Sequence, residues 1–457
     1  MDMELVSTQL QAKDIAVLFQ GKDSTHIATQ FRELIETGSI AEGSKMPSVR
    51  EMASNLGVSV GTIALAWSDL KNEGLITTRR RGGTYVVGLK QAQEVGRTSW
   101  PPAPLNLSQA SPDPRLQPSL EKALIAGLNA DKMNSVSLDY IIEPLRLTVQ
   151  SQWPFEAEAW TIVGASSESM LLCLQAATSP GDKIAVEQPT SSRLLAIARL
   201  LNLQIVGVEC DQSGPMIEPL SSALGDSPKA FIYQPRGHQP LGITVSVARV
   251  AEMAAILRKH QDVCVIEDDA LGPLCADESA SLGSMLPQQT LLIRSYCKAF
   301  GLDLRSSVIG GASEWVDRVR LERSRGLGVT SRILQGALNY LLRDPETETM
   351  VSVARKNYAF RRRTLSTVLD RLGVEISPAR DGLMVWISVE DEAAAISHLS
   401  SKAIQAAPGR RFFGIQVKGH HIAISVGQLP TDRVGIEAVA SEIAIAARIG
   451  TDDISFD

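Results

Sequence analysis

The chain has few cysteines, few aromatic residues and no long apolar run. Its five cysteines are scattered and form no CxxC pair, which excludes a disulfide framework and favours a reducing, cytoplasmic location. Aromatic residues make up 5% of the chain, and no stretch approaches the roughly 18 apolar residues of a membrane span. The N-terminus has no basic segment followed by an apolar core, so we expect no signal peptide and no membrane attachment.

The chain also has no excess of positive charge. Lys and Arg number 45 against 51 Asp and Glu, for a formal net charge of −6. A protein that bound nucleic acid over its whole surface would be basic, so any contact with DNA must be local. At 457 residues the chain is long enough for two or three domains.

Residues 25–88 have the layout of a winged helix-turn-helix. Helices are predicted over 25–37 and 48–56, a turn follows at Gly57, and a second helix opens at Ser59 and ends at Gly74. That helix has one apolar face at helical spacing, formed by Ile63, Ala66, Trp67 and Leu70. Two short strands follow, joined by a basic hairpin tip.

This layout predicts DNA as a partner. The candidate contacts are Ser48, Arg50, Ser59, Gly61, Thr62, Arg79, Arg80, Arg81 and Gly82. Arg50 could instead form a surface ion pair with a nearby Glu, and the arginine-rich tip could be a solvated turn. The side chains that open the recognition helix are small, so we expect phosphate and methyl contacts there more than bidentate readout of bases.

The rest of the chain divides by composition and pattern. Residues 1–24 form an extension, 89–116 have the Pro- and Ser-rich composition of a linker, and 117–457 form a second domain. There, apolar runs alternate with amphipathic stretches, which predicts an α/β fold with a mostly parallel sheet covered on both faces. The expected strands are 160–163, 183–186, 204–208, 230–233, 263–266, 290–294 and 307–310. We expect a large subdomain over about 150–345 and a smaller one over about 346–457.

Ligands of such sheets collect at the carboxyl ends of the strands. Gly164, Ala165, Ser166 and Ser167 follow the first strand and can hold an anion at a helix start. Glu267, Asp268 and Asp269 follow a buried strand, and Ser295, Lys298 and Arg305 follow the next. A lysine that forms an imine, a carboxylate for a ring N–H⁺ and an anion site suit a phosphorylated aromatic aldehyde.

These segments resemble known families. Residues 25–88 look like a GntR-type winged helix, residues from about 110 to 457 resemble fold-type I aminotransferases, and the tandem resembles the MocR subfamily of GntR regulators. The resemblance implies that pyridoxal 5′-phosphate binds at Lys298, with Asp268 on its ring nitrogen. It also implies that Gln239 contacts the 3-hydroxyl and that Ala165, Ser166, Ser167, Ser295 and Arg305 hold the phosphate. The family further implies a head-to-tail homodimer that responds to a small-molecule effector and binds promoter DNA.

The chain departs from the aminotransferase pattern at three places. Ser191 replaces the aromatic residue that stacks on the cofactor, and Ala270 or Leu271 replaces a tyrosine. Ala423 replaces the arginine that grips a substrate carboxylate, which argues against ordinary transamination. The sequence leaves three hypotheses: a cofactor-responsive regulator, a working aminotransferase with a DNA-binding module, and a sensor of another small molecule.

Several other polar residues have open roles at this stage. Arg236 could line an effector site or support its turn. His238, His420 and His421 have no carboxylate or cysteine partner at metal-ligand spacing, so we expect solvated or core histidines and no metal. Tyr296 is expected to pack, and Glu267 and Asp269 could shape the rim or pair with backbone donors.

Overall fold

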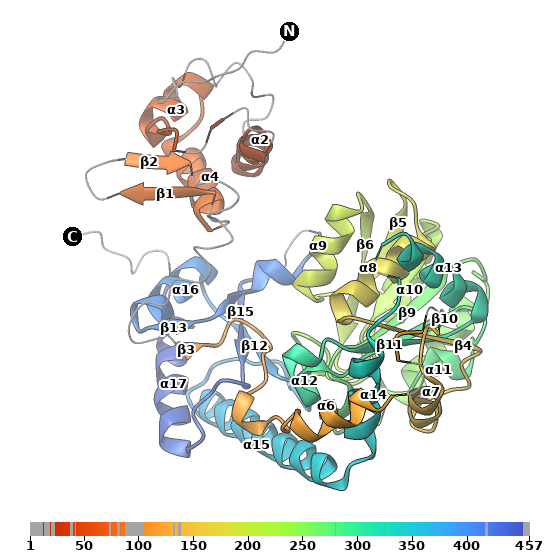
Figure 1. The fold of residues 1–457 in the computed structure, drawn as a ribbon. Coiled ribbons are helices and arrows are strands. Elements are labelled where there is room, and N and C mark those ends of the chain that lie inside the picture. Colours follow the sequence, from red (N-terminus) through yellow and green to blue (C-terminus); the bar gives the residue numbers. More distant parts are fainter. Residues whose placement is uncertain are drawn as a thin grey trace. The chain divides into compact units, whose positions relative to one another are not determined.

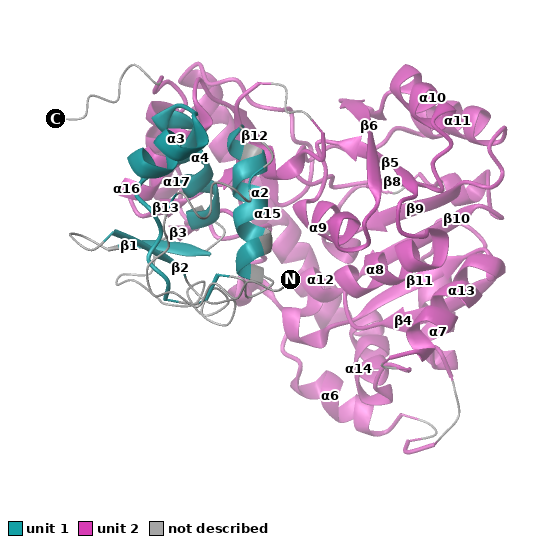
Figure 2. Ribbon diagram, turned by 90° about the horizontal axis from the view of Figure 1, so that it is seen from above, with its two compact units in different colours: residues 1–103 teal, residues 104–457 magenta. Residues whose placement is uncertain are grey.

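The computed structural model divides the chain into two compact units, Met1–Ala103 and Pro104–Asp457 (Figures 1 and 2). It describes residues 12, 19, 23–36, 40–41, 43–72, 75–79, 83–86, 105–130, 133–135, 139–278, 280–326, 328–415 and 419–450. Within these ranges no helix is both long and apolar enough to cross a membrane.

Unit 1 is the expected winged helix-turn-helix. Its elements are α2 (Ser24–Glu36), α3 (Val49–Leu56), α4 (Val60–Asn72), β1 (Ile76–Arg79) and β2 (Gly83–Val86). The apolar face of α4 packs with Phe31 of α2 and Met52 of α3 in one core. The two strands pair antiparallel with Ile76 opposite Val86. Gly74 and the hairpin tip, Arg80, Arg81 and Gly82, lie outside the described residues.

Unit 2 is built on an eight-stranded sheet in the order β4-β11-β10-β9-β8-β5-β6-β7. The strands are β4 (Ala159–Val163), β5 (Lys183–Gln188), β6 (Gln204–Asp211), β7 (Gly214–Pro215), β8 (Ala230–Tyr233), β9 (Cys264–Asp269), β10 (Thr290–Ser295) and β11 (Ser307–Gly311). The ladders from β10 to β6 are parallel, whereas β11 runs antiparallel to both its neighbours. The prediction of a mostly parallel sheet is confirmed.

Helices cover both faces of this sheet because successive strand residues point to opposite sides. One core joins alternate strand residues such as Ile266 to α8 (Ser166–Ala177), α9 (Ser192–Leu200) and α13 (Ser313–Ser324). Another joins their neighbours, such as Val265, to α10 (Ile217–Gly225) and α11 (Val247–Leu257). The α/β fold class is therefore confirmed at the level of packing.

A second sheet has the order β12-β15-β14, from β12 (Met384–Ser388), β15 (His421–Ser425) and β14 (Ala407–Pro408). The helices around it are α15 (Pro345–Arg371), α16 (Glu392–Ser401) and α17 (Arg433–Ala446). Within the described residues, the other α-helices of unit 2 are α6 (Glu121–Leu128), α7 (Glu143–Gln150), α12 (Cys297–Phe300) and α14 (Arg332–Arg343). This sheet occupies the predicted small subdomain.

The expected linker of 89–116 is too long at its C-terminal end. Residues 105–116 belong to unit 2, because β3 (Leu105–Asn106) pairs in parallel with β13 (Ile404–Gln405) and Leu107 is fully buried. The carboxylate of Asp113 lies 2.7 Å from Nη2 of Arg361, and both side chains are buried. Residues 105–116 are rich in Pro and Ser, a composition typical of linkers, so the sequence did not predict this packing.

Candidate functional site

A cavity of about 400 Å³ lies at the carboxyl ends of β8, β9 and β10. All eight residues predicted for the cofactor line it: Ala165, Ser166, Ser167, Gln239, Asp268, Ser295, Lys298 and Arg305. They come from separate segments that only the fold brings together. Arg193, Arg411 and residues 108–111 also line the cavity, and the sequence did not single them out.

Asp268 reaches the cavity because β9 continues through all three acidic residues. We expected the strand to end at residue 266, but it ends at Asp269, so Asp268 points opposite to Glu267 and Asp269. Its Oδ1 atom is buried and has no hydrogen-bond partner among the described residues. Burial raises the pKa of Asp268 to about 7, with Lys298 opposing that rise.

Glu267 and Asp269 are structural instead. Glu267 accepts hydrogen bonds from Ser281 Oγ (2.5 Å) and the Leu282 amide (2.7 Å), as well as from the Tyr233 hydroxyl. Asp269 pairs with Arg236 and Arg294 at 2.8 Å each. Arg236 thus supports its turn, and it also donates to the carbonyls of Asp277 and Gly272.

Lys298 lies in the short helix α12 and faces the same cavity as Asp268. Burial lowers the pKa of Lys298 to about 8, Asp268 opposes this shift, and the guanidinium of Arg193 adds to it. The lowered pKa increases the fraction of free amine, the form that carbonyl chemistry needs. Tyr296, two residues before Lys298, is buried and stacks on Phe300, as expected.

The predicted anion turn is only partly free. The Gly164 amide donates to Glu168 Oε2 at 2.6 Å, so this amide already has a partner. The following residues open α8, where the first N–H groups of a helix have no intrahelical acceptor. Arg193 Nη1 donates to Ser167 Oγ at 2.5 Å and brings a second arginine to the turn. Sequence spacing could not show this contact, because Arg193 reaches the turn from α9.

The Gln239 turn rests on a buried polar network. Gln234 holds the Gln239 backbone at both its amide (3.0 Å) and its carbonyl (3.1 Å), and donates to Glu187 Oε1 at 2.8 Å. Gln239 thereby lines the cavity from a backbone held in place by hydrogen bonds. Gln234 had no predicted role.

His238 does have the carboxylate and cysteine neighbours that the sequence did not reveal. Candidate ligand atoms of Glu187, Cys210 and His238 all lie within 4.8 Å of one another. The Leu241 amide donates to His238 Nδ1 at 3.3 Å, which places the ring proton on Nε2. That nitrogen lies 3.2 Å from Glu187 Oε1, and the absence of a metal at this cluster stays a prediction.

The three departures from the aminotransferase pattern also have definite places. Ser191 and Ala270 line the cavity and leave it without the two expected aromatic side chains. Ala423 is fully buried in β15, between Trp386 of β12 and Ala407 of β14. No arginine therefore enters from this strand.

In unit 1 two predicted contact residues also cap helices. Ser48 Oγ accepts from the Glu51 amide (3.2 Å) and Glu51 Oε2 accepts from the Ser48 amide (2.9 Å), a capping box. Ser59 Oγ accepts from the Thr62 amide at 3.0 Å. Arg50 and Gly61 are exposed, and Arg50 has no ion pair within the described ranges. The side chain of Arg79 lies outside them.

Comparisons with known families match both units. Residues 110–431 match the family "Aminotransferase class I and II", and residues 23–86 match "Bacterial regulatory proteins, gntR family". The chain is similar to the vitamin B6 salvage pathway transcriptional repressor PtsJ of Salmonella typhimurium, at 28% identity over 90% of this chain and 96% of PtsJ. It is also similar to the HTH-type pyridoxine biosynthesis transcriptional regulator PdxR of Corynebacterium glutamicum, at 24% identity over 93% and 96%.

Solved structures show the same fold for unit 2. Aspartate aminotransferase of Thermus thermophilus with maleate has a TM-score of 0.65 at 20% identity, over 78% of this chain and 94% of the enzyme. LysN, the α-aminoadipate aminotransferase of Thermus thermophilus, has a TM-score of 0.68 at 19% identity, over 83% and 98%.

Proposed function

The chain belongs to the aminotransferase class I and II family and carries a GntR-type domain ahead of that region, which is the domain arrangement of the MocR subfamily. From this arrangement we propose that the protein is a transcription regulator that responds to a cofactor. It is a GntR-type transcription regulator with an aminotransferase-like domain. In this proposal unit 1 binds promoter DNA, unit 2 binds pyridoxal 5′-phosphate, and binding changes the affinity for DNA. The names of PtsJ and PdxR, both concerned with vitamin B6, support this choice of ligand.

One observation carries the cofactor assignment: a buried carboxylate oxygen without a partner shares a cavity with a lysine of lowered pKa. A protonated pyridine ring supplies the donor that Asp268 Oδ1 lacks. When bound, the cofactor supplies an aldehyde that can link covalently to the Lys298 amine. Arg305, Ser295 and the start of α8 would bind its phosphate, and Gln239 would bind its 3-hydroxyl.

We propose that unit 2 does not transaminate ordinary amino acids. Ala423 cannot form the paired hydrogen bonds that an arginine makes with a substrate carboxylate. Turnover of an amino acid with an oxoacid acceptor, lost in Lys298→Ala, would instead support the aminotransferase hypothesis. A sensor of another small molecule keeps the DNA role and predicts no covalent cofactor.

The cofactor test is visible absorbance of the purified full chain with added pyridoxal 5′-phosphate. We expect a lysine-linked absorbance band in the parent and in Lys259→Ala, an exposed control, and none in Lys298→Ala. Borohydride reduction followed by peptide mapping should place the cofactor on Lys298. No band in the parent would refute cofactor binding and leave the sensor of another molecule.

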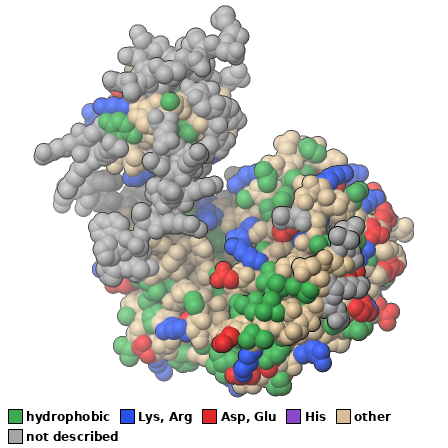
Figure 3. Space-filling view, in the orientation of Figure 1, with side chains coloured by type: hydrophobic (Ala, Val, Ile, Leu, Met, Phe, Trp, Pro, Cys, Tyr) green, Lys and Arg blue, Asp and Glu red, His purple; other side chains and the backbone are tan. Residues whose placement is uncertain are grey.

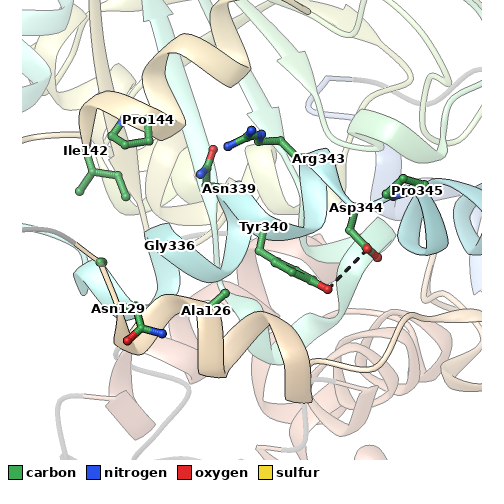
Figure 4. Close-up of a pocket in the computed structure, with 11 residues that line it drawn as sticks. Ala126, Asn129, Ile142, Pro144, Gly336, Asn339, Tyr340, Arg343, Asp344 and Pro345 are labelled. Carbon is green, nitrogen blue, oxygen red and sulfur yellow. Dashed lines mark hydrogen bonds between the residues drawn. The ribbon is translucent and has the colours of Figure 1, made fainter.

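We also propose a homodimer formed through the face that carries α6. Leu124, Ile125 and Leu128 are 38%, 57% and 59% exposed, and Leu147 of α7 is 53% exposed. Figure 3 shows apolar side chains gathered over this part of unit 2. A hollow of about 420 Å³ lies beside them between α6 and α14, with the Tyr340 hydroxyl directed at Asp344 (Figure 4). A second copy would remove this apolar area from water.

Sedimentation of an Ile125→Asp, Leu128→Asp double variant tests this interface. We expect a monomer, while Val247→Asp, at a more exposed apolar site on α11, stays dimeric. A dimeric double variant would place the interface elsewhere. The free state of all five cysteines supports the proposal of a reducing cytoplasm.

A further inference from the structure

The outward face of the recognition helix α4 has an unusual composition. Val60, Gly61, Ala64, Leu65 and Ser68 are all exposed, and at 3.6 residues per turn they span an arc of about 140°. Val60 is 51% and Leu65 is 61% exposed. Among these five residues the Ser68 hydroxyl is the one polar side-chain group, and Lys71 and Asn72 fall within the same arc only in the last turn of the helix.

The helix cannot rotate to present other side chains. Its opposite face, with Ile63, Ala66, Trp67 and Leu70, is buried in the core of unit 1. The Ser59–Thr62 hydrogen bond fixes its first turn. Lys71 is the first charged side chain in line with the arc, and it lies in the last turn of the helix, away from the N-terminal residues that meet base edges.

This composition limits how the helix can read a base pair. Guanine, adenine and cytosine are recognised by arginine, lysine, asparagine, glutamine or acidic side chains, and the part of the arc from Val60 to Ser68 contains none of these. The feature of the major groove that apolar side chains recognise is the 5-methyl group of thymine. Arg50 and Lys45 are available for phosphate contacts, which give affinity without sequence information.

We propose that α4 reads thymine methyl groups through Val60, Ala64 and Leu65, so that the site under this helix is selected for A·T pairs. The inference rests on the proposed DNA binding of unit 1 and adds the class of base that it recognises. Specificity at this helix then comes from apolar burial and shape, with hydrogen bonding confined to the edges of the contact.

The experiment replaces thymine with deoxyuridine, which removes the methyl group and leaves every hydrogen-bonding edge intact. A duplex of about 30 bp is first selected from a random library with the full-length protein, and its contact region is footprinted. Each thymine in that region is then replaced singly, and the dissociation constant is measured by fluorescence anisotropy at one salt concentration. We expect an increase of about fourfold wherever Val60 or Leu65 covers the methyl group, the factor for one buried CH₂-sized group.

A variant pair identifies the side chain. In Leu65→Ala the penalty for deoxyuridine should disappear at one position in each half-site, while Val247→Ala, an exposed truncation in unit 2, keeps every penalty. Unchanged affinity for all deoxyuridine duplexes would overturn methyl readout and leave DNA binding intact. Failure to select any duplex would overturn DNA binding itself. If Leu65→Ala weakens thymine and deoxyuridine duplexes equally at every position, Leu65 acts on something other than a methyl group and the assignment is wrong.

Discussion

Replacing Asp268 with asparagine should change stability and cofactor affinity in opposite directions. The substitution keeps the size of the side chain and removes its charge. Asp268 is 8% exposed, and its Oδ1 atom has no partner in the described part of the chain. Without cofactor, the folded protein therefore holds a buried carboxyl group that resists ionisation.

The effect on stability depends on pH in a defined way. Burial raises the pKa of Asp268 from 3.8 in the unfolded chain to about 7 in the folded protein. Below about pH 4 the carboxyl is protonated in both the folded and the unfolded protein, so its burial does not lower the free energy of unfolding. Its contribution to stability is lost as pH rises through about 7, and the loss amounts to at most roughly 4 kcal/mol. Asparagine does not titrate but still buries an amide, so we expect a net gain of about 1–3 kcal/mol at pH 8 without cofactor.

The effect on cofactor binding has the opposite sign. Asparagine removes the charge from the hydrogen bond to the ring nitrogen, which costs roughly 1.5–3 kcal/mol. That loss raises the dissociation constant for pyridoxal 5′-phosphate about 10- to 150-fold. Denaturant unfolding of the cofactor-free protein between pH 5 and 8 and an absorbance titration at pH 8 measure the two effects separately.

Asp269→Asn is the matched control on the same strand. Burial raises its pKa, but Arg294 and Arg236 outweigh burial and hold the pKa of Asp269 below its ordinary value. Removing its charge leaves the buried Arg294 and the largely buried Arg236 without an ion-pair partner, so this variant should lose about 3–5 kcal/mol. The reasoning fails if Asp268→Asn has the parent's unfolding free energy at every pH, or the parent's affinity for the cofactor.

Other substitutions test other parts of the site and its support. Arg193→Ala should raise the pKa of Lys298 and weaken cofactor binding. The loss of affinity should be only about fivefold, because Arg193 is exposed and its charge is screened by solvent. Arg193→Lys keeps the charge and serves as the control, and a pH titration of absorbance measures the pKa and the affinity in each variant. Arg361→Met leaves the buried Asp113 carboxylate with Arg115 alone and should cost about 3–5 kcal/mol in denaturant unfolding, an expectation that parent-like stability would contradict. Gly272→Ala puts a β-carbon at φ +51° and 2.1 Å from the Ser295 carbonyl, so it should cost at least about 1 kcal/mol and weaken cofactor binding in the same titration. Ser48→Ala breaks the capping box of α3 and should lower the stability of unit 1 by about 1 kcal/mol, and a larger fall in DNA affinity than in stability would identify a direct contact.

The sequence predicts the fold and most of the cavity residues from local signals, whereas the role of Gln239 and the choice of Asp268 among the three acids follow from the resemblance to fold-type I aminotransferases. A strand followed by a small-residue turn, a carboxylate or a lysine can be identified from a few neighbouring residues, and parallel strands bring such ends together. The different roles of Glu267, Asp268 and Asp269 could also have been predicted from the sequence. Had the strand been extended through residue 269, its period of two would have placed Asp268 opposite to its neighbours.

Other features depend on contacts that spacing does not encode. Arg193 meets Ser167 across 26 positions, and Glu187, Cys210 and His238 converge from three segments. Residues 105–116 were misassigned because Pro and Ser are typical of linkers, whereas the fold of this segment depends on β13 and Arg361, about 250 to 300 residues away. Long-range pairing of this kind is determined only by the completed fold.

Residues 105–113 also determine where the two units are joined. The covalent connection from unit 1 enters unit 2 here, β3 and the Asp113–Arg361 pair hold it, and residues 108–111 between those two anchors form one wall of the cavity. The attachment of the DNA-binding unit and the surface that a ligand touches are therefore the same short segment. In the proposed regulator, a ligand that contacts this wall would therefore bind within a few residues of the point where the chain enters unit 2.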